Sequence, residues 1–119
     1  MLDTTRDLLQ SGGIEVDELL DRCMDNDALA GRLLKKFSVD PTYSKLVAAC
    51  AANDSAMALE AAHTLKGLCG NLALGRLFRL TTRQVELLRT NDSAAAMALM
   101  PKIDQAYNEA LTAIQKSFS

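Results

Sequence analysis

Apolar residues recur every three to four positions along the whole chain, which is the period of an amphipathic helix. The strict apolar–polar alternation of a half-buried strand is absent, and β-branched and aromatic residues are sparse. Hydrophobic residues make up 49% of the chain but aromatic residues only 4%, so the core must consist of Leu, Ala, Met and Val. Such side chains suit closely packed helices. We therefore predict an all-α fold.

Helix-capping residues divide this periodic pattern into segments. Asp17 is the expected cap of the second helix, and Asp40-Pro41 places Asp at the N-cap and Pro at the first helical position of the fourth. The triplet Asn-Asp-Ser at 53–55 and again at 91–93 opens two later helices in the same way. Helices are expected over about 3–10, 17–24, 27–37, 42–52, 54–73, 75–90 and 93–117.

The joins between the longer helices are short, which makes sequence neighbours antiparallel. We expect an antiparallel up-down four-helix bundle over about 40–117, with additional short N-terminal helices over about 1–38 that pack across it. Pro101 lies inside the last helix and predicts a kink or a restart there. At this length, residues 1–119 are expected to form one domain.

Charge and composition exclude several classes of partner. A net charge of −2 gives no reason to expect binding to nucleic acid or to an anionic membrane. No apolar stretch approaches the length of a membrane span, and the N-terminal MLDTTRDLLQ does not read as a signal peptide. The three cysteines form no CxxC pair, so we expect buried free thiols in a reducing cytoplasm.

The stretch AHTLKGLCGNL over 62–72 holds the only histidine of the chain. On a helical wheel, one face carries His63, Lys66, Gly67 and Gly70, and the other carries Ala61, Leu65, Leu68, Cys69 and Leu72. A glycine inside a helix costs up to ~1 kcal/mol relative to alanine. Two glycines beside one histidine therefore suggest that another surface comes close to the imidazole.

Two of the possible roles of His63, metal binding and hydrolysis, have little support in the sequence. A metal site is poorly supported, because a single histidine without clustered carboxylates or thiolates lacks further ligands. Hydrolysis is poorly supported as well, since no serine with an oxyanion hole is in evidence and Cys69 lies on the core face. The imidazole itself remains as a nucleophile toward phosphorus. Lys66 would then neutralise the phosphoryl oxygens, and the glycines would admit the donor.

The run His63-Thr-Leu-Lys66-Gly67, followed by Gly70-Asn71-Leu72, closely resembles the signature of histidine phosphotransfer (HPt) domains of two-component signalling. The resemblance covers nearly the whole chain in length and helix order. It implies that His63 accepts a phosphoryl group from an aspartate of a receiver domain, that Lys66 stabilises that group and that Gly67 gives access. It also implies no ATP site and no cofactor on this chain, with Mg²⁺ held by the partner receiver domain.

One position departs from the family pattern. Many members carry a glutamine about 22 residues after the histidine, where this chain has Val85. The neighbouring Gln84 falls on the inward stripe of its helix, and a buried glutamine needs a partner. Two interpretations stay open: Gln84 orients His63 or the phosphoryl group, or it bonds backbone or water at an edge of the bundle.

Apolar residues around a solvent-facing histidine suggest a docking patch. The candidate partner-binding residues are Ala56, Leu59, Glu60, Gly70 and Leu74, and family analogy adds Ile14 and Val16. Glu60 either bonds the second imidazole nitrogen or pairs with Lys66 or water. A basic stripe of Arg76, Arg79 and Arg83 either meets an acidic receiver surface or is a solvated outer face.

Together these features predict a cytoplasmic, monomeric phosphocarrier that serves response-regulator receiver domains or a hybrid histidine kinase, and that is not an enzyme with its own ATP site. The expected nucleophile is Nε2 of His63. The alternative is a phosphate-independent helical adaptor that binds a receiver or another signalling partner through the same face. A purely structural bundle would leave the two glycines beside His63 unexplained.

Overall fold

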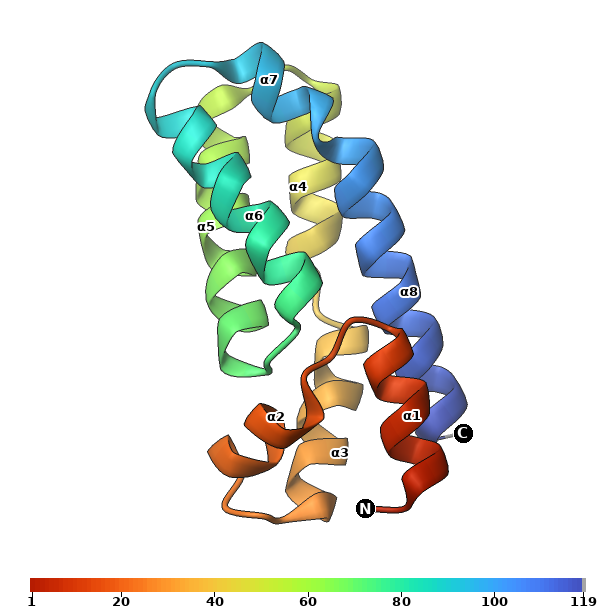
Figure 1. Cartoon of the computed structure of the whole chain (residues 1–119). Coiled ribbons are helices and arrows are strands. Elements are labelled where there is room, and N and C mark those ends of the chain that lie inside the picture. The colour runs from red at the N-terminus through yellow and green to blue at the C-terminus, as the bar shows by residue number, and fades with distance from the viewer. Residues whose placement is uncertain (119) are drawn as a thin grey trace.

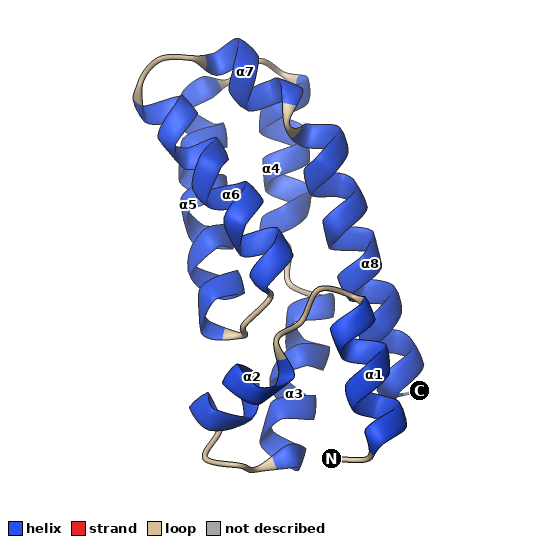
Figure 2. Cartoon of the chain, viewed as in Figure 1, coloured by secondary structure: helices blue, strands red, loops and turns tan. Residues whose placement is uncertain are grey.

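The computed structural model of the chain describes residues 1–118, which form eight helices and no strand (Figure 1; Figure 2). The helices are α1 (Asp3–Ser11), α2 (Val16–Arg22), α3 (Asp27–Ser38), α4 (Thr42–Ala51), α5 (Ser55–Asn71), α6 (Gly75–Arg89), α7 (Ser93–Ala98) and α8 (Met100–Phe118). The molecule is elongated, with principal extents of 44 × 23 × 20 Å. The predicted all-α fold is confirmed.

Helices α4, α5, α6 and α8 form the predicted up-down bundle (Figure 1). Helix α5 packs against both α4 and α6, and α6 packs against α8. The bundle closes between α4 and α8, where the ring of Tyr43 stacks on Tyr107 with 3.6 Å between centroids. The Tyr43 hydroxyl also donates a hydrogen bond to the carboxylate of Asp104. Because α5 packs against α4 and α6, one of its faces is covered and the other points outward.

The N-terminal helices extend the bundle instead of crossing it. Helices α1 and α3 both pack against α8, whose 19 residues run alongside the two halves of the molecule (Figure 1). The reason is the buried stripe of α8, which continues through Ala110, Ala113 and Ile114, beyond the part that faces α6. An apolar stripe of that length must be covered to its end, and α1 and α3 cover it.

Two helix starts use the predicted caps. The Asp54 carboxylate accepts a hydrogen bond from the Met57 N–H at 3.1 Å, and the Asp92 carboxylate accepts one from the Ala95 N–H at 3.2 Å. The asparagine before each cap, Asn53 and Asn91, has a positive φ of 52° and 62°, a conformation that asparagine tolerates better than most residues. The sequence triplets at 53–55 and 91–93 therefore build equivalent turns.

Two other starts differ from the prediction. Helix α2 begins at Val16, one residue before Asp17, so Asp17 lies in its first turn and forms an ion pair with Arg6. Helix α4 begins at Thr42, within the expected range, but its N-cap is Pro41 and not Asp40. The Asp40 carboxylate still accepts the Thr42 N–H at 2.8 Å, and hydrogen bonds from Thr42 lower the pKa of Asp40.

The break predicted at Pro101 is a restart. Helix α7 ends at Ala98 and α8 begins at Met100, which places Pro101 in the first turn of α8. A proline is tolerated there because the first helical N–H groups have no intrahelical acceptor.

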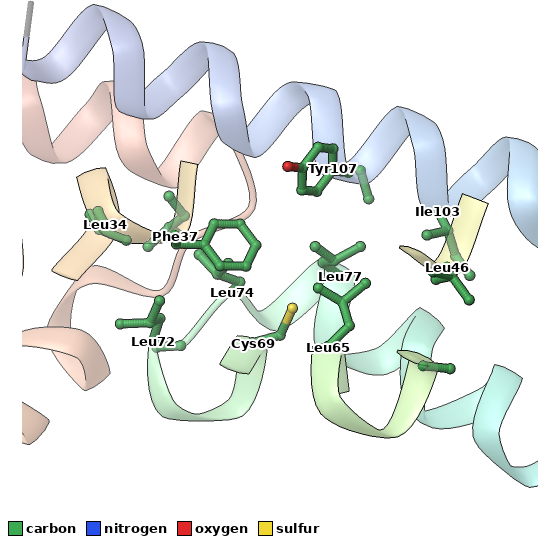
Figure 3. Packing of buried hydrophobic residues seen from close by; sticks show 14 of the residues in the cluster. Leu34, Phe37, Leu46, Leu65, Cys69, Leu72, Leu74, Leu77, Ile103 and Tyr107 are labelled. Carbon is green, nitrogen blue, oxygen red and sulfur yellow. The ribbon is translucent and has the colours of Figure 1, made fainter. Parts of the chain in front are cut away.

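The core contains the apolar face of α5 that the sequence predicts. Leu65 and Cys69 point into the interior toward Leu77 of α6 and the side chains of α8 (Figure 3). Burial raises the pKa of the Cys69 thiol to about 12. A thiol with such a pKa stays protonated at neutral pH, so Cys69 is a core residue and not a nucleophile.

Three residues predicted to lie at the docking patch belong to this core instead. Leu74, Ile14 and Val16 are each only 1% exposed. The helical wheel fails at Leu74 because α5 ends at Asn71 and the chain turns, which carries Leu74 beneath the bundle near Phe37 (Figure 3). The segment that holds Ile14 and Val16 is tied to the same turn, since the Glu15 N–H donates to the Ala73 carbonyl at 2.8 Å.

Substitution of Gly12 tests the close approach of α1 to α8. A Cβ at Gly12 would lie 2.9 Å from the Glu109 carbonyl oxygen and closer still to the Cβ of Ala113. We expect Gly12→Ala to lower the free energy of unfolding by about 1–3 kcal/mol, because the two helices must move apart. Urea unfolding followed by circular dichroism measures the change.

The matched control is Gly67→Ala, where a Cβ would meet nothing within 4 Å. The same added methyl group should there raise the free energy of unfolding by up to ~1 kcal/mol through helix propensity. Equal stability of Gly12→Ala and the wild type would contradict the packing described for α1 and α8.

Candidate functional site

Helix α5 presents a buried stripe on one face and the signature residues on the other. The stripe consists of Ala58, Ala61, Ala62, Leu65 and Cys69. His63 and Gly67 are exposed, and Lys66 and Gly70 are partly exposed. The structure thus brings the four signature residues onto one open face, as the helical period predicts.

A shallow depression of about 310 Å³ lies beside the histidine. Five of its lining residues belong to α5, and α2 and α6 contribute one each. The lining residues are Arg22, His63, Lys66, Gly67, Gly70, Asn71 and Phe78. The opening is wide, so a group presented by another molecule can reach the histidine.

The two glycines of this face have different surroundings. A Cβ at Gly67 would meet nothing within 4 Å, so Gly67 keeps the surface beside His63 low. A Cβ at Gly70 would lie 3.0 Å from Cε1 of Phe78. Gly70 therefore lets the Phe78 ring of α6 pack closely on α5, and it lines the depression at the same time.

Two further residues of this face, Lys66 and Glu60, lack the side-chain partners that the sequence suggested for them. Within residues 1–118, no salt bridge engages Lys66. Over the same residues, the Glu60 carboxylate bonds neither His63 nor Lys66, and only its backbone carbonyl accepts a bond from the Thr64 hydroxyl. Ala56 is exposed and Leu59 is half-buried on the turns before His63.

Two arginines near His63 escaped the sequence analysis. Nη2 of Arg89, in the last turn of α6, lies 3.4 Å from Nδ1 of His63. Arg22 of α2 lines the depression and is held by Glu18, with 2.9 Å between Nη2 and Oε1, which lowers the pKa of Glu18. The position of Arg89 near His63 could have been predicted from the sequence, because antiparallel packing of α5 and α6 brings the end of α6 beside the middle of α5.

The part of the chain that the structure describes contains neither a membrane-spanning helix nor a metal-binding cluster. Over residues 1–118, no helix combines the length and apolarity that crossing a bilayer requires. Over the same residues, no group of three or more His, Cys, Asp or Glu side chains is placed to hold a metal ion.

Comparison of the sequence with models of protein families shows which family the chain belongs to. The family model described as Hpt domain matches residues 16–116, nearly the whole chain. The chain belongs to the Hpt domain family. Hpt domains are phosphocarriers that interact with receiver domains in phosphorelays, and they are not ATP-binding enzymes. Comparisons with curated proteins and with solved structures gave no match.

In this Hpt domain, Gln84, which was a candidate for orienting His63, forms its hydrogen bonds inside the core. Gln84 is fully buried, and its Nε2 donates to the Ala96 carbonyl at 3.1 Å and to Sδ of Met100 at 3.3 Å. Gln84 therefore ties α6 to α7 and α8 and does not contact His63. Of the two interpretations, the structure favours the one in which Gln84 bonds the backbone, although its partner lies in the core and not at an edge of the bundle.

The basic stripe of the Hpt domain is largely neutralised. Arg76 pairs with Glu109, Arg79 with Glu15 at 3.3 Å, and Arg83 with Glu86 at 3.5 Å. A stripe in which each arginine faces a carboxylate is a solvated outer face, and it offers little net positive charge to a partner.

Proposed function

We propose that this Hpt domain accepts a phosphoryl group on His63 from the aspartyl phosphate of a receiver domain and relays it to the aspartate of another receiver. The observation that carries the proposal is the open face of α5. It holds one exposed histidine, a lysine one turn away without an ion pair among the described residues, and a glycine beside which nothing stands within 4 Å. Family membership supplies the phosphoryl chemistry.

The transfer step follows from imidazole chemistry. Nε2 of the neutral ring attacks the phosphorus of the aspartyl phosphate in line, the N–P bond forms, and the P–O bond to the receiver carboxylate breaks. The aspartate leaves as a carboxylate, and the ring loses its Nδ1 proton to water. Lys66 opposes the negative charge of the phosphoryl oxygens. Mg²⁺ belongs to the receiver, and this chain needs no cofactor of its own.

The docking surface proposed for the receiver is the part of α5 around the histidine. It includes Ala56, Leu59 and Glu60 on one side of His63 and Gly70 on the other, without Leu74. The partners are response-regulator receivers, one of which can belong to a hybrid histidine kinase. Such partners act in the cytoplasm, and a monomer keeps the His63 face open to each in turn.

Removal of the imidazole tests the proposal directly. A panel of receiver domains carrying labelled aspartyl phosphate is mixed with the wild type and with His63→Gln, and acid-labile label on the chain is measured. We expect label on the wild type and none on His63→Gln, with unchanged circular dichroism because His63 is exposed and outside the core. Label on His63→Gln would contradict the proposal. Receiver binding without label on either protein would favour the adaptor.

Substitution of Lys66 tests its part in the transfer. We expect Lys66→Ala to slow transfer from a receiver by about tenfold or more, because a hydrogen bond to a charged group contributes about 1.5–3 kcal/mol. Rapid-quench kinetics measures the rate, and calorimetry with an unphosphorylated receiver checks that docking is retained. The control is Lys102→Ala, which removes an exposed lysine of α8. Equal transfer rates for Lys66→Ala and the control would refute this role.

A further inference from the structure

A groove runs along the outer face of α8, away from His63. It consists of two adjoining depressions of about 510 Å³ and 370 Å³, which share Ser11, Gln105 and Glu109. Helix α5 packs on α4 and α6, and α8 contacts the same two helices, so α5 and α8 lie diagonally across the bundle (Figure 1). The groove and the depression beside His63 have no lining residue in common. A molecule bound in this α8 groove therefore leaves the His63 face uncovered.

A row of exposed side chains on α8 runs the length of the groove. The row consists of Lys102, Gln105, Asn108, Thr112 and Lys116, which follow one another at intervals of three or four residues. Such intervals place side chains on one face of a helix. The face is straight and contains no large side chain that would block a second helix laid along it.

Apolar side chains from two other helices line the groove at its two ends. Leu80 of α6 lines the same depression as Lys102, and Leu8 of α1 lines the same depression as Lys116. Both leucines are partly exposed. Helix α1 lies close to α8 because Gly12 has no side chain, which brings Leu8 to the edge of the groove. An occupant can therefore bury apolar side chains at both ends.

The groove is positively charged, although the net charge of the chain is −2. Among the described residues that line it, Arg76, Lys102 and Lys116 are cations and Glu109 is the carboxylate. Glu109 is already engaged, since it pairs with Arg76 and accepts a hydrogen bond from Gln105 at 3.0 Å. Within residues 1–118, no salt bridge engages Lys102 or Lys116. The unbalanced positive charge thus lies at the two ends of the groove.

The two lysines decide between possible occupants. In a two-fold pair of antiparallel α8 helices centred on Glu109, Lys102 of one copy would face Lys116 of the other, because both lie seven positions from Glu109. Like charges at both ends disfavour a second copy of this chain. A helix that carries carboxylates matches the same ends. The two lysines are 14 positions apart, and a helix rises about 21 Å over that distance, or four turns.

We propose that the α8 groove binds an acidic amphipathic helix of a partner protein, with carboxylates at Lys102 and Lys116 and apolar side chains against Leu8 and Leu80. Recognition of this kind places the apolar face of one helix in a groove between others. The inference goes beyond the function proposed for His63 and does not depend on it. It gives the domain a second contact, which holds it on a partner while the histidine stays free for receivers.

A designed peptide tests the groove without knowledge of the natural partner. The probe is an alanine-based helical peptide of about 20 residues, with leucines along one face and glutamates spaced to meet Lys102 and Lys116. A second peptide has lysines in place of the glutamates, and a third has the first composition in scrambled order. Each is titrated into the ¹⁵N-labelled full chain, so that NMR shifts report both the affinity and the place of binding.

We expect the acidic peptide to shift residues of the α8 groove and to leave those around His63 unchanged. The double variant Lys102→Glu, Lys116→Glu should bind it about tenfold more weakly or worse, and should instead bind the lysine peptide. The matched control is Lys36→Glu, Lys45→Glu, which changes the net charge equally at exposed lysines outside the groove. The control should bind the acidic peptide nearly as the wild type does, and the scrambled peptide should bind neither.

Four results would overturn the inference. They are equal affinity of the two double variants for the acidic peptide, failure of the lysine peptide to bind Lys102→Glu, Lys116→Glu, shifts that map to α5, and self-association of the wild type through α8 in sedimentation equilibrium. Should the charge-reversed protein fail to fold by circular dichroism, Lys102→Gln, Lys116→Gln takes its place, with the same weakened binding of the acidic peptide expected. Labelling of His63 by a receiver is measured separately, so failure of this inference leaves the phosphocarrier function standing.

Discussion

The one-sided packing of α5 is the constraint on which the rest of the structure depends. Leu65 and Cys69 fix one face of the helix in the core, and the close contact of Gly70 with Phe78 sets the distance to α6. Since helices α4 and α6 occupy the sides of that buried face, the opposite face has no neighbour above Gly67. An exposed histidine on a rigid helix is the consequence. The fold thereby presents a nucleophile at a fixed place without enclosing it.

Two positive side chains near the histidine, Lys66 and Arg89, take part in no salt bridge within residues 1–118. Along α6, the arginines that point away from the site meet Glu15, Glu86 or Glu109, while Arg89 meets the imidazole. Lys66 stands one turn beyond His63 on α5. Exposed ion pairs contribute little to stability, so the pairing of the outer arginines matters more for removing competing positive charge than for holding the fold.

The helices and the two faces of α5 could be predicted from the sequence because period and capping are local properties. Asp54 and Asp92 cap their helices as expected, and the signature residues share one face. The predicted positions of side chains were wrong where a change in chain direction or a contact with a distant helix determines them. Leu74 lies past the end of α5, where the wheel no longer applies, and the partners of Gln84 come from α7 and α8. Arg22 reaches the site only through the placement of α2, which no local pattern specifies.

The central claim is that Gly67 keeps this face open for a protein donor, and a comparison of two donors tests it most directly. Gly67→Gln places a long side chain beside His63 without touching the core. Transfer is measured from a phosphorylated receiver and, in parallel, from phosphoramidate. The account predicts that Gly67→Gln loses most of the receiver-driven transfer and keeps labelling by the small donor. Receiver-driven transfer at the wild-type rate would contradict it.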